Sequence, residues 1–379
     1  MQGMWLESED QFRAHVDDWD NALAESGIDD PFLLSAFLLT WWGQFSEGRR
    51  LCVFAAYDGE KLVGGLPLYV ERRMGQNIMR FPGGDDDDYA VANYTNFLAC
   101  KKRWNGVVDL FIDCLDLRKD WDVIHFHRLH ATEEQIEHIV RSFKRRCLHL
   151  LHRDQQAVFM IDVPESFEHF LKNSSKKKRK AIRQSYRDAD SYGRLHLEQV
   201  SGALDIEQLF DRYVVLSRES YRVRGGKSTF EDQKLTDFFR RLLICLDRVS
   251  VVGAYELKID QQTIAIGFCY SICGNINYII TAFSFEFESY RPGYLLMSEL
   301  LKKAIEIDAS HMNLYTGETP QKLYWSNRRE TTYQLFVGRD NFKNRLIKTK
   351  LIIKLKDHAL ATRRLLGKST LLRTLKRKL

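Results

Sequence analysis

Residues 249–308 narrow the possible folds of this chain more than any other part of the sequence. Three apolar segments separated by short polar turns predict the strands of an antiparallel meander: 249–260, 263–272 and 276–284. An amphipathic segment comes next at 290–308, with Pro292 in its first turn, and it predicts a helix. This block therefore indicates a mixed α/β unit.

The start of this helix has the chemistry of a phosphate site. Its sequence is Tyr290-Arg291-Pro292-Gly293-Tyr294-Leu295. A helix N-terminus offers unpaired backbone N–H groups and the positive end of the dipole, which together favour a pyrophosphate. Gly293 would let the phosphates approach the backbone, and Arg291 would add a charge-assisted contact. A Pro-Gly pair also starts helices that bind nothing, so these residues alone leave both interpretations open.

The remainder of the second half alternates between helices and strands. Helices are predicted before the meander at 166–171, 175–189, 206–221 and 231–246. After the helix at 290–308, the pattern predicts a strand at 312–318, a short helix at 319–327 and a final strand at 331–340.

The first half contains a similar hairpin pattern at residues 51–73, where two apolar runs flank Asp58-Gly59. Residues 53–68 and 252–270 share the order apolar strand, Tyr, polar turn, apolar strand, Gly, which suggests two copies of one fold. The other predicted elements of the first half are a helical region at 1–45, a strand at 121–129, a helix at 132–147 and a strand at 157–163.

The length of 379 residues predicts two domains. No Pro-rich or Gly/Ser-rich linker separates them, so we expect them to pack together. The acidic N-terminal sequence does not resemble a signal peptide, and the longest apolar stretch, 31–43, is too short to span a bilayer. Seven cysteines without a C-x-x-C pair fit the reduced thiols of a cytoplasmic protein.

The net charge of +6 is concentrated near the C-terminus. Residues 341–379 hold thirteen Lys or Arg and one acid, Asp357, so the rest of the chain is mildly acidic. This distribution argues against nucleic acid as a partner of the whole chain. The tail predicts a basic amphipathic helix, which favours peripheral association with an anionic membrane surface. A packing helix with a frayed end is the alternative.

Other signals carry less weight. His125, His127 and His130 resemble a metal cluster, but no further ligand follows at the usual spacing, so we expect no metal. The basic run at 176–180 fits either a solvated helix face or a phosphate-binding surface. No Gly-x-Ser-x-Gly motif supports a hydrolase.

Four segments of the second half carry a family resemblance: SSKKKRKAIR (174–183), LSRESYRVRGG (216–226), YRPGYLL (290–296) and NLYTGETPQKLYW (313–325). Together with the order of elements, they resemble the GNAT superfamily of acyltransferases. More closely, they resemble the branch of cellulose-biosynthesis protein CelD and related exopolysaccharide-locus acetyltransferases, which are relatives of the Fem-type peptidyltransferases. The resemblance covers most of residues 160–340 and, more loosely, the first 160.

The sequence departs from the family pattern in the last segment. Asn313 stands where the family usually has an acid, and Thr316 stands where it usually has Arg, whereas Gly317, Glu318 and Lys322 are retained.

The helix start and the first half depart as well. The start of the helix has one glycine, Gly293, where GNAT enzymes typically have two, and Tyr294 takes the place of the second. The first half has no such turn after its hairpin; residues 81–97 stand there instead, and their four Asp at 85–88 would repel a pyrophosphate. That half is predicted to be a degenerate, structural copy.

The resemblance implies an α/β (α+β) fold class with tandem GNAT-like domains. Each domain would be a mixed, mostly antiparallel twisted sheet flanked by helices. The predicted domains are a degenerate N-terminal GNAT-like domain at 1–160, a catalytic GNAT domain at 161–340 and a basic amphipathic helical tail at 341–379.

The resemblance also implies the chemistry. In GNAT enzymes an acceptor amine or hydroxyl attacks the thioester of acyl-coenzyme A directly, helped by a base, a polarising backbone N–H and an acid that protonates the thiolate. The co-substrate would be acetyl-CoA or another acyl-CoA, with no metal. The residues expected to bind it are Tyr290, Arg291, Gly293, Tyr294 and Leu295.

Three further residues are the catalytic candidates. Tyr324, on the short helix after the fifth strand, is the candidate acid, and a ring packed in the core is the alternative. Glu318 is the candidate base or acceptor anchor, although an acid there also complements a helix dipole. Lys322 would fix an acidic group of the acceptor. The candidate substrate-binding residues are Arg218, Glu219, Arg224 and Tyr315.

We therefore expect an N- or O-acyltransferase that acts on an amino sugar, polysaccharide or cell-envelope precursor through a ternary complex. Its acceptor would be a small molecule or glycan, and its location the cytoplasm, at the inner membrane face if the tail binds lipid. One alternative is a Fem-like aminoacyl-tRNA-dependent peptidyltransferase, with tRNA as the partner. Another is a catalytically inactive double-GNAT scaffold of a polysaccharide synthase complex, which Asn313 and Thr316 favour.

Overall fold

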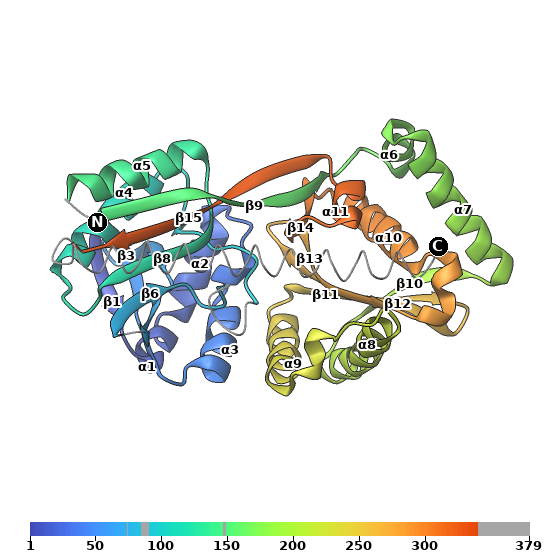
Figure 1. Cartoon of the computed structure of the whole chain (residues 1–379), viewed down its shortest axis with the longest axis horizontal. Coiled ribbons are helices and arrows are strands. Elements are labelled where there is room, and N and C mark those ends of the chain that lie inside the picture. Colours follow the sequence, from blue (N-terminus) through green and yellow to red (C-terminus); the bar gives the residue numbers. More distant parts are fainter. Residues whose placement is uncertain (74, 85–90, 147–148, 340–379) are drawn as a thin grey trace.

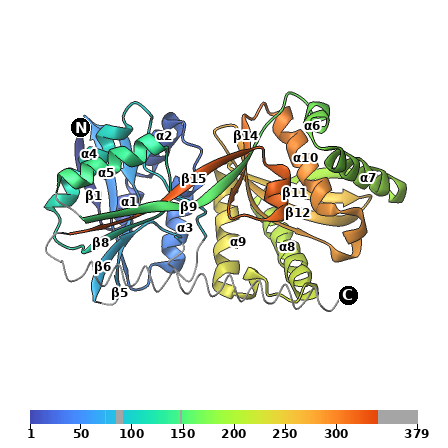
Figure 2. The ribbon, with the colours of Figure 1, turned by 45° about the horizontal axis from the view of Figure 1, so that its top comes forward.

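The structure of the chain is a computed structural model that describes residues 1–73, 75–84, 91–146 and 149–339. Two α/β halves lie side by side along the long axis of the molecule (Figure 1). A long pair of strands, β9 (His149–Asp162) and β15 (Arg328–Gly338), runs from one half into the other. Helices lie on both sides of the strands in each half (Figure 2).

The N-terminal half begins with a strand where the sequence predicted helix. β1 (Gln2–Leu6) pairs antiparallel with β3 (Val53–Asp58), and the ring of Trp5 lies 5.3 Å from that of Phe54. The strand forms because this pairing partner, some 50 residues away, overrides a weak local preference. The first 45 residues are otherwise helical, in α1 (Glu9–Arg13), α2 (Val16–Ser26), η1 (Pro31–Leu33) and α3 (Ser35–Phe45).

The predicted hairpin around Asp58-Gly59 is present, and both of its strands lie in the same sheet, whereas the strands that flank the hairpin lie in another. The other elements of the half are β2 (Arg49–Leu51), β4 (Lys61–Leu66), β5 (Tyr69–Arg73), β6 (Gln76–Arg80), β7 (Leu98–Ala99), α4 (Trp104–Leu117), β8 (Val123–His130) and α5 (Glu133–Arg145). β3 and β4 belong to the four-stranded sheet β1-β3-β4-β7, while β2 and β5 belong to an eleven-stranded sheet.

The C-terminal half contains the predicted meander. Its strands β11 (Val252–Ile259), β12 (Gln262–Ile272) and β13 (Asn275–Phe283) pair antiparallel in order. The edge strand β10 (Leu195–Val200) was not predicted, because its residues are half-buried or exposed without clear alternation. The remaining elements are α6 (Phe167–Asn173), α7 (Lys176–Tyr192), α8 (Ala203–Val223), η2 (Thr229–Glu231), α9 (Gln233–Arg248), η3 (Phe285–Tyr290), α10 (Pro292–Glu306), β14 (His311–Thr316) and α11 (Pro320–Trp325).

Each half ends its meander with one parallel pair of strands. In the C-terminal half β13 pairs with β14 only at Ile276↔Met312 and Asn277↔Asn313, so the rest of the two strands is not bonded together. In the N-terminal half β6 pairs in parallel with β8. This shared order, an antiparallel meander and then a parallel pair, supports the prediction of two copies of one fold.

The two copies exchange their last strands. β8 pairs with β15 from the C-terminal half, β14 pairs with β9 from the N-terminal half, and β9 and β15 pair with each other. One sheet therefore runs through both halves, whereas the sequence predicted one sheet for each. The predicted boundary between residues 160 and 161 lies within β9 and stays a prediction, and the predicted tail at 341–379 lies outside the described residues.

Helices join the halves as well. Phe238 of α9 contacts Phe37 and Phe45 of α3, with ring centroids 6.1 and 5.4 Å apart.

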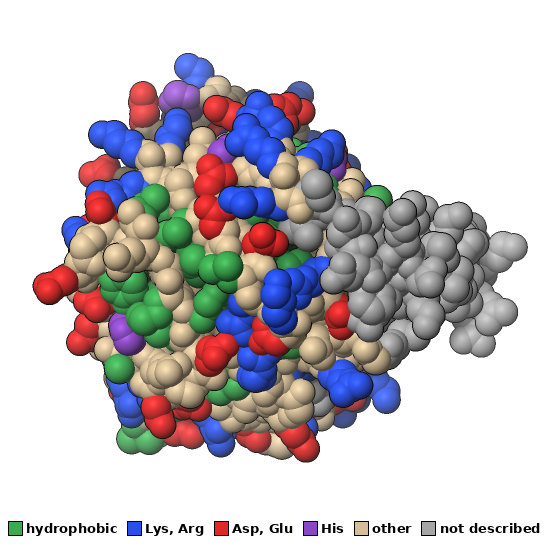
Figure 3. Space-filling model, turned by 90° about the vertical axis from the view of Figure 1, so that its left-hand side faces the viewer, with side chains coloured by type: hydrophobic (Ala, Val, Ile, Leu, Met, Phe, Trp, Pro, Cys, Tyr) green, Lys and Arg blue, Asp and Glu red, His purple; other side chains and the backbone are tan. Residues whose placement is uncertain are grey.

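The end face of the N-terminal half shows side chains of both charges interspersed with a group of hydrophobic ones (Figure 3). Within the described ranges, no helix combines the length and the apolar character needed to cross a bilayer.

Candidate active site

The start of α10 turns sharply out of η3. Arg291 caps the helix in the left-handed conformation, with φ 54°, and Pro292 takes the first helical position. The N–H groups of Tyr294 and Leu295 both turn back to the carbonyl of Arg291, at 2.8 and 3.3 Å. Because the first turn of a helix has no earlier carbonyl to pair with, the N–H of Gly293 is left for another acceptor.

Gly293 is not required by crowding. A Cβ built on it would meet only Nε2 of Gln321, at 3.9 Å. The missing side chain instead leaves the backbone of the first turn open to a pocket of about 230 Å³. The pocket lies between the C-terminal part of α8, strands β12 and β13, the start of α10 and α11, and its lining is partly polar, with Ser220, Thr281 and Gln321 among the contributors.

One face of α8 supplies polar groups to this pocket. Ser217, Ser220 and Arg224 all line it, and their spacing of three and four residues places them on one side of the helix. The guanidinium of Arg224 lies 5.0 Å from the ring centroid of Phe283 and donates a hydrogen bond to Oγ of Ser220. The two serines were not singled out from the sequence, although this helical spacing was the available signal.

The other predicted substrate-binding residues lie elsewhere. Arg218 donates twice to the carbonyl of Phe230, at 2.6 and 3.0 Å, and so anchors η2. Glu219 is half-buried on α8 and does not line the pocket. Tyr315 is only 2% exposed. Of the four candidates, the structure brings only Arg224 to the pocket.

The residues predicted to bind acyl-CoA also lie in different places. Gly293 lines the pocket, whereas Leu295 is fully buried in the core. Nη1 of Arg291 lies 3.5 Å from the carbonyl of Ala181 on α7, so it faces that helix. The ring of Tyr290 packs beside Tyr192, and the ring of Tyr294 stacks on Tyr324 at 5.1 Å.

Tyr324 lies beside the first turn of α10. Its ring is nearly parallel to that of Tyr294, with an interplanar angle of 6°. Burial, together with Tyr294, raises the pKa of Tyr324 to about 12, so the hydroxyl stays protonated at neutral pH. Tyr324 does not line the pocket, however, so its role as proton donor stays a prediction.

Lys322 and Glu318 have contrasting surroundings. Nζ of Lys322 donates to the carbonyl of Thr316 at 2.5 Å. Burial, and then the neighbouring Arg128, lower the pKa of Lys322 to about 8. Glu318 is exposed and precedes Thr319, whose hydroxyl caps α11. Neither side chain lines the pocket, although Gln321, the residue before Lys322, does.

A family comparison covers this region. Residues 176–323 match Acetyltransf_6, an acetyltransferase (GNAT) domain. No curated protein matches the chain at a significant level.

Solved structures resemble the chain over most of its length. FemX has a TM-score of 0.65 at 10% identity, covering 92% of this chain and 100% of that chain. The C-terminal domain of a putative lysylphosphatidylglycerol synthetase from Agrobacterium fabrum has a TM-score of 0.51 at 12% identity, covering 92% and 96%. L-PGS from Bacillus licheniformis also has 0.51, at 13% identity, covering 90% and 95%.

At such low identities these likenesses show the fold alone. The predicted mixed α/β fold of tandem GNAT-like halves is confirmed, and the C-terminal half has an acyltransferase-like GNAT domain. The CelD-like branch stays a prediction.

The two departures from the family pattern serve the junction of the halves. Asn313 is fully buried; its Nδ2 donates to the hydroxyl of Tyr94 at 2.7 Å, and its Oδ1 accepts from the N–H of Tyr315 at 2.8 Å. Oγ1 of Thr316 lies 3.1 Å from the carbonyl of Asn93 and accepts from Arg128 at 3.2 Å. Both residues of the GNAT domain thus bond to side chains or backbone of the N-terminal half.

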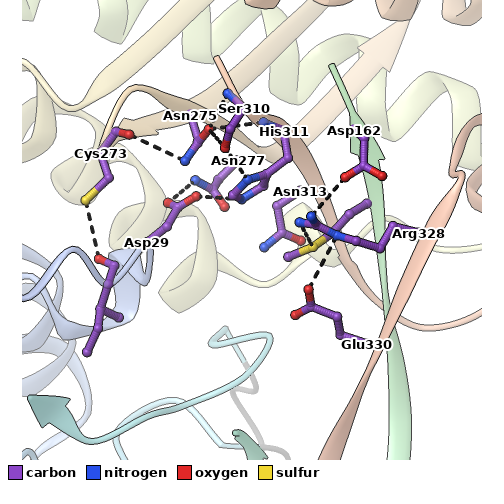
Figure 4. A network of polar contacts seen from close by, with 12 residues as sticks. Asp29, Asp162, Cys273, Asn275, Asn277, Ser310, His311, Asn313, Arg328 and Glu330 are labelled. Atoms are coloured by element: carbon purple, nitrogen blue, oxygen red, sulfur yellow. Dashed lines mark hydrogen bonds and ion pairs between the residues drawn. The ribbon is translucent and has the colours of Figure 1, made fainter. Parts of the chain in front are cut away.

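A further polar network at this junction was not predicted from the sequence (Figure 4). Asp29, from the loop before η1, accepts a hydrogen bond from Asn277 at 2.6 Å and lies 2.9 Å from Nε2 of His311. Oδ1 of Asn275 accepts from both Ser310 and the backbone of His311. The network ties the N-terminal half to the starts of β13 and β14, where the parallel pair forms.

The histidines noted in the sequence are packed with other partners. The rings of His125 and His127 lie 5.5 Å apart, and His130 contacts Glu330 at 2.7 Å. Across the ranges that the structure describes, no three His, Cys, Asp or Glu side chains gather as metal ligands would.

Proposed function

We propose that this chain is an acyl-CoA-dependent acyltransferase. It would move an acetyl or longer acyl group to an amine or hydroxyl of an amino sugar, polysaccharide or cell-envelope precursor. The observation that carries the proposal is the open first turn of α10 at Gly293, which faces the 230 Å³ pocket within a domain that matches a GNAT family. A pocket of this size takes part of a ligand rather than a whole nucleotide.

The surrounding residues support direct transfer. The N–H of Gly293 and the dipole of α10 favour a pyrophosphate at the first turn. Tyr324, which remains protonated at neutral pH, would give its proton to the departing thiolate. Glu318 is exposed, so it can act as the base only if the bound acceptor places its nucleophile beside this carboxylate.

The junction of the halves supports an acceptor with an anionic group. Lys322 is half-buried, donates to a carbonyl and has the guanidinium of Arg128 as its charged neighbour. Two cations so placed attract a phosphate or carboxylate. Lys322 comes directly after Gln321, which lines the pocket, although the side chain of Lys322 itself does not.

A Fem-like transfer from aminoacyl-tRNA is the second candidate. The exposed Lys176, Lys177 and Lys180 at the start of α7 favour it, since that helix packs against α10 beside the pocket. A scaffold without catalysis remains the third. Binding of the tail at 341–379 to an anionic membrane stays part of the proposal for the first candidate.

Isothermal titration with acetyl-CoA tests the proposal. The wild-type chain should bind it, and Gly293→Glu, which places a carboxylate at the phosphate position, should weaken binding by more than about tenfold. Gly43→Glu is the matched control, because Gly43 is exposed on α3 and a Cβ there meets no atom within 4 Å.

The outcomes separate the candidates. Unchanged affinity in a folded Gly293→Glu variant would rule out the first turn of α10 as the acetyl-CoA site. A wild-type chain that does not bind acetyl-CoA but binds aminoacyl-tRNA would favour the Fem-like candidate. A chain that binds neither ligand would favour the scaffold.

A further inference from the structure

One lysine of the basic run on α7 is not part of its solvated face. Lys176, Lys177 and Lys180 are exposed, but Lys178 is half-buried. Its Nζ lies 4.5 Å from the ring centroid of Phe170, 5.1 Å from Tyr324 and 5.0 Å from Trp325. The ammonium therefore sits within a cage of three aromatic rings contributed by α6 and α11.

Lys178 makes a polar contact inside this cage. Nζ donates to the main-chain carbonyl of Tyr324 at 2.7 Å, and among the described residues no ion pair joins Lys178 to a carboxylate. An ammonium has three donors, so a single carbonyl and three ring faces compensate its lost hydration only in part. Burial accordingly lowers the pKa of Lys178 to about 8.

The contact satisfies a specific need of α11. This helix has only six residues, and its last carbonyls have no partner within the helix. Lys178 bonds one of them, that of Tyr324, and so fixes the end of α11 against α7. The neighbouring Arg179 performs a different task, since it donates to Leu171 and Lys172 at the end of α6.

Fixing α11 also fixes the side chains it presents to the pocket region. Tyr324 stacks on Tyr294 in the first turn of α10, and Gln321 lines the pocket opposite Gly293. A shift of α11 would therefore move the candidate proton donor relative to the open first turn.

We propose that Lys178 is a positioning residue of the donor site: its ammonium, held by Phe170, Tyr324 and Trp325, sets α11 against the first turn of α10. The inference rests on the proposed acyl-CoA-dependent function. The charged form of Lys178 makes the cage contacts. The neutral amine can still donate a hydrogen bond, but the rings no longer attract it as they attract a cation. Donor binding should therefore weaken as the pH rises through about 8.

Two substitutions separate charge from packing. Lys178→Met keeps the aliphatic stem and removes the charge, and it should weaken acetyl-CoA binding at pH 7 by about tenfold and abolish the alkaline decline. Lys178→Arg stays charged, so it should restore much of the affinity and move the decline to higher pH. Lys119→Met, at an exposed lysine of the N-terminal half, is the control and should match the wild type.

The experiment combines acetyl-CoA titrations at several pH values with NMR of ε-¹³C-lysine-labelled chain, in which the signal missing from Lys178→Met identifies Lys178. A Lys178 signal that titrates near pH 8 together with the expected affinity changes would support the inference. Wild-type affinity and pH dependence in a folded Lys178→Met variant would overturn it, and the lysine would then be a packing residue. A wild-type chain that binds no acetyl-CoA would overturn the proposed function, and this inference with it.

Discussion

At the scale of single residues, one substitution tests the proposed role of the Tyr324 hydroxyl as proton donor to the thiolate. Tyr324→Phe keeps the ring stacked on Tyr294 and removes only the proton donor. If Tyr324 is the acid, kcat should fall by about 10²-fold or more while the KM for acyl-CoA changes little. Steady-state thioester cleavage measures both, starting with slow hydrolysis where no acceptor is at hand.

Tyr333→Phe is the control for that experiment, because Tyr333 lies on β15 opposite Leu129, in the N-terminal half. Wild-type turnover in a folded Tyr324→Phe enzyme would leave water or the acceptor to protonate the thiolate. Since the pKa of Tyr324 is raised to about 12, the hydroxyl itself should not limit the rate through neutral pH.

Local chemistry predicted some site residues and not others. The Pro-Gly pair predicted the first turn of α10 correctly, because the preference of Pro for the first helical position is a local property of the chain. Tyr315 was expected to reach substrate and is buried instead. The pairing of β14 with β9 shifts register between Asn313 and Thr316, and Tyr315 itself has φ 62°. Such an irregularity breaks strand alternation, and nothing in the local sequence announces it.

At the scale of elements, the sequence predicted the strands better than their partners. Hydrophobic alternation indicated β9, β14 and β15, yet β14 pairs with β9 and β15 pairs with β8. Alternation shows which face of a strand is buried but not which distant edge it joins, because that depends on contacts more than 200 residues apart.

The exchanged strand β15 makes a testable electrostatic contact. Glu330 on β15 bonds His130 on β8 at 2.7 Å, and this hydrogen bond lowers the pKa of Glu330 below its ordinary value. A carboxylate with a depressed pKa in the folded state adds stability above about pH 4.5, and that part is lost as the pH falls through the lowered value. Glu330→Gln should therefore lower the thermal unfolding temperature at pH 7, and its difference from the wild type should shrink as the pH falls below 4.5.

Glu60→Gln, in the exposed turn of the first hairpin, serves as the control for thermal unfolding and should leave the temperature unchanged at both pH values. A constant difference between Glu330→Gln and wild type from pH 7 to pH 4 would show that the hydrogen bond does not depend on the charge of Glu330.

At the scale of the whole molecule, the two halves are copies that differ in the start of the helix after each meander. In the C-terminal half, α10 begins with Pro292-Gly293 and opens to the pocket. In the N-terminal half, the next helix is α4, whose first residue, Trp104, is buried and whose cap, Arg103, is paired with Asp58 at 2.6 Å. The bulky ring and the paired guanidinium leave this second helix start poorly suited to a phosphate.

One acyl-CoA should therefore bind each chain. Calorimetric titration of the full chain with acetyl-CoA should give a stoichiometry of one. Gly293→Glu should remove most of that single binding event, since we expect no second phosphate-binding site to replace it. Arg103→Ala breaks the ion pair between the cap of α4 and Asp58, and it should leave the stoichiometry at one. A measured value of two, with one event surviving in Gly293→Glu, would show that the N-terminal half is a working donor site and that its buried Trp104 must move to admit the ligand.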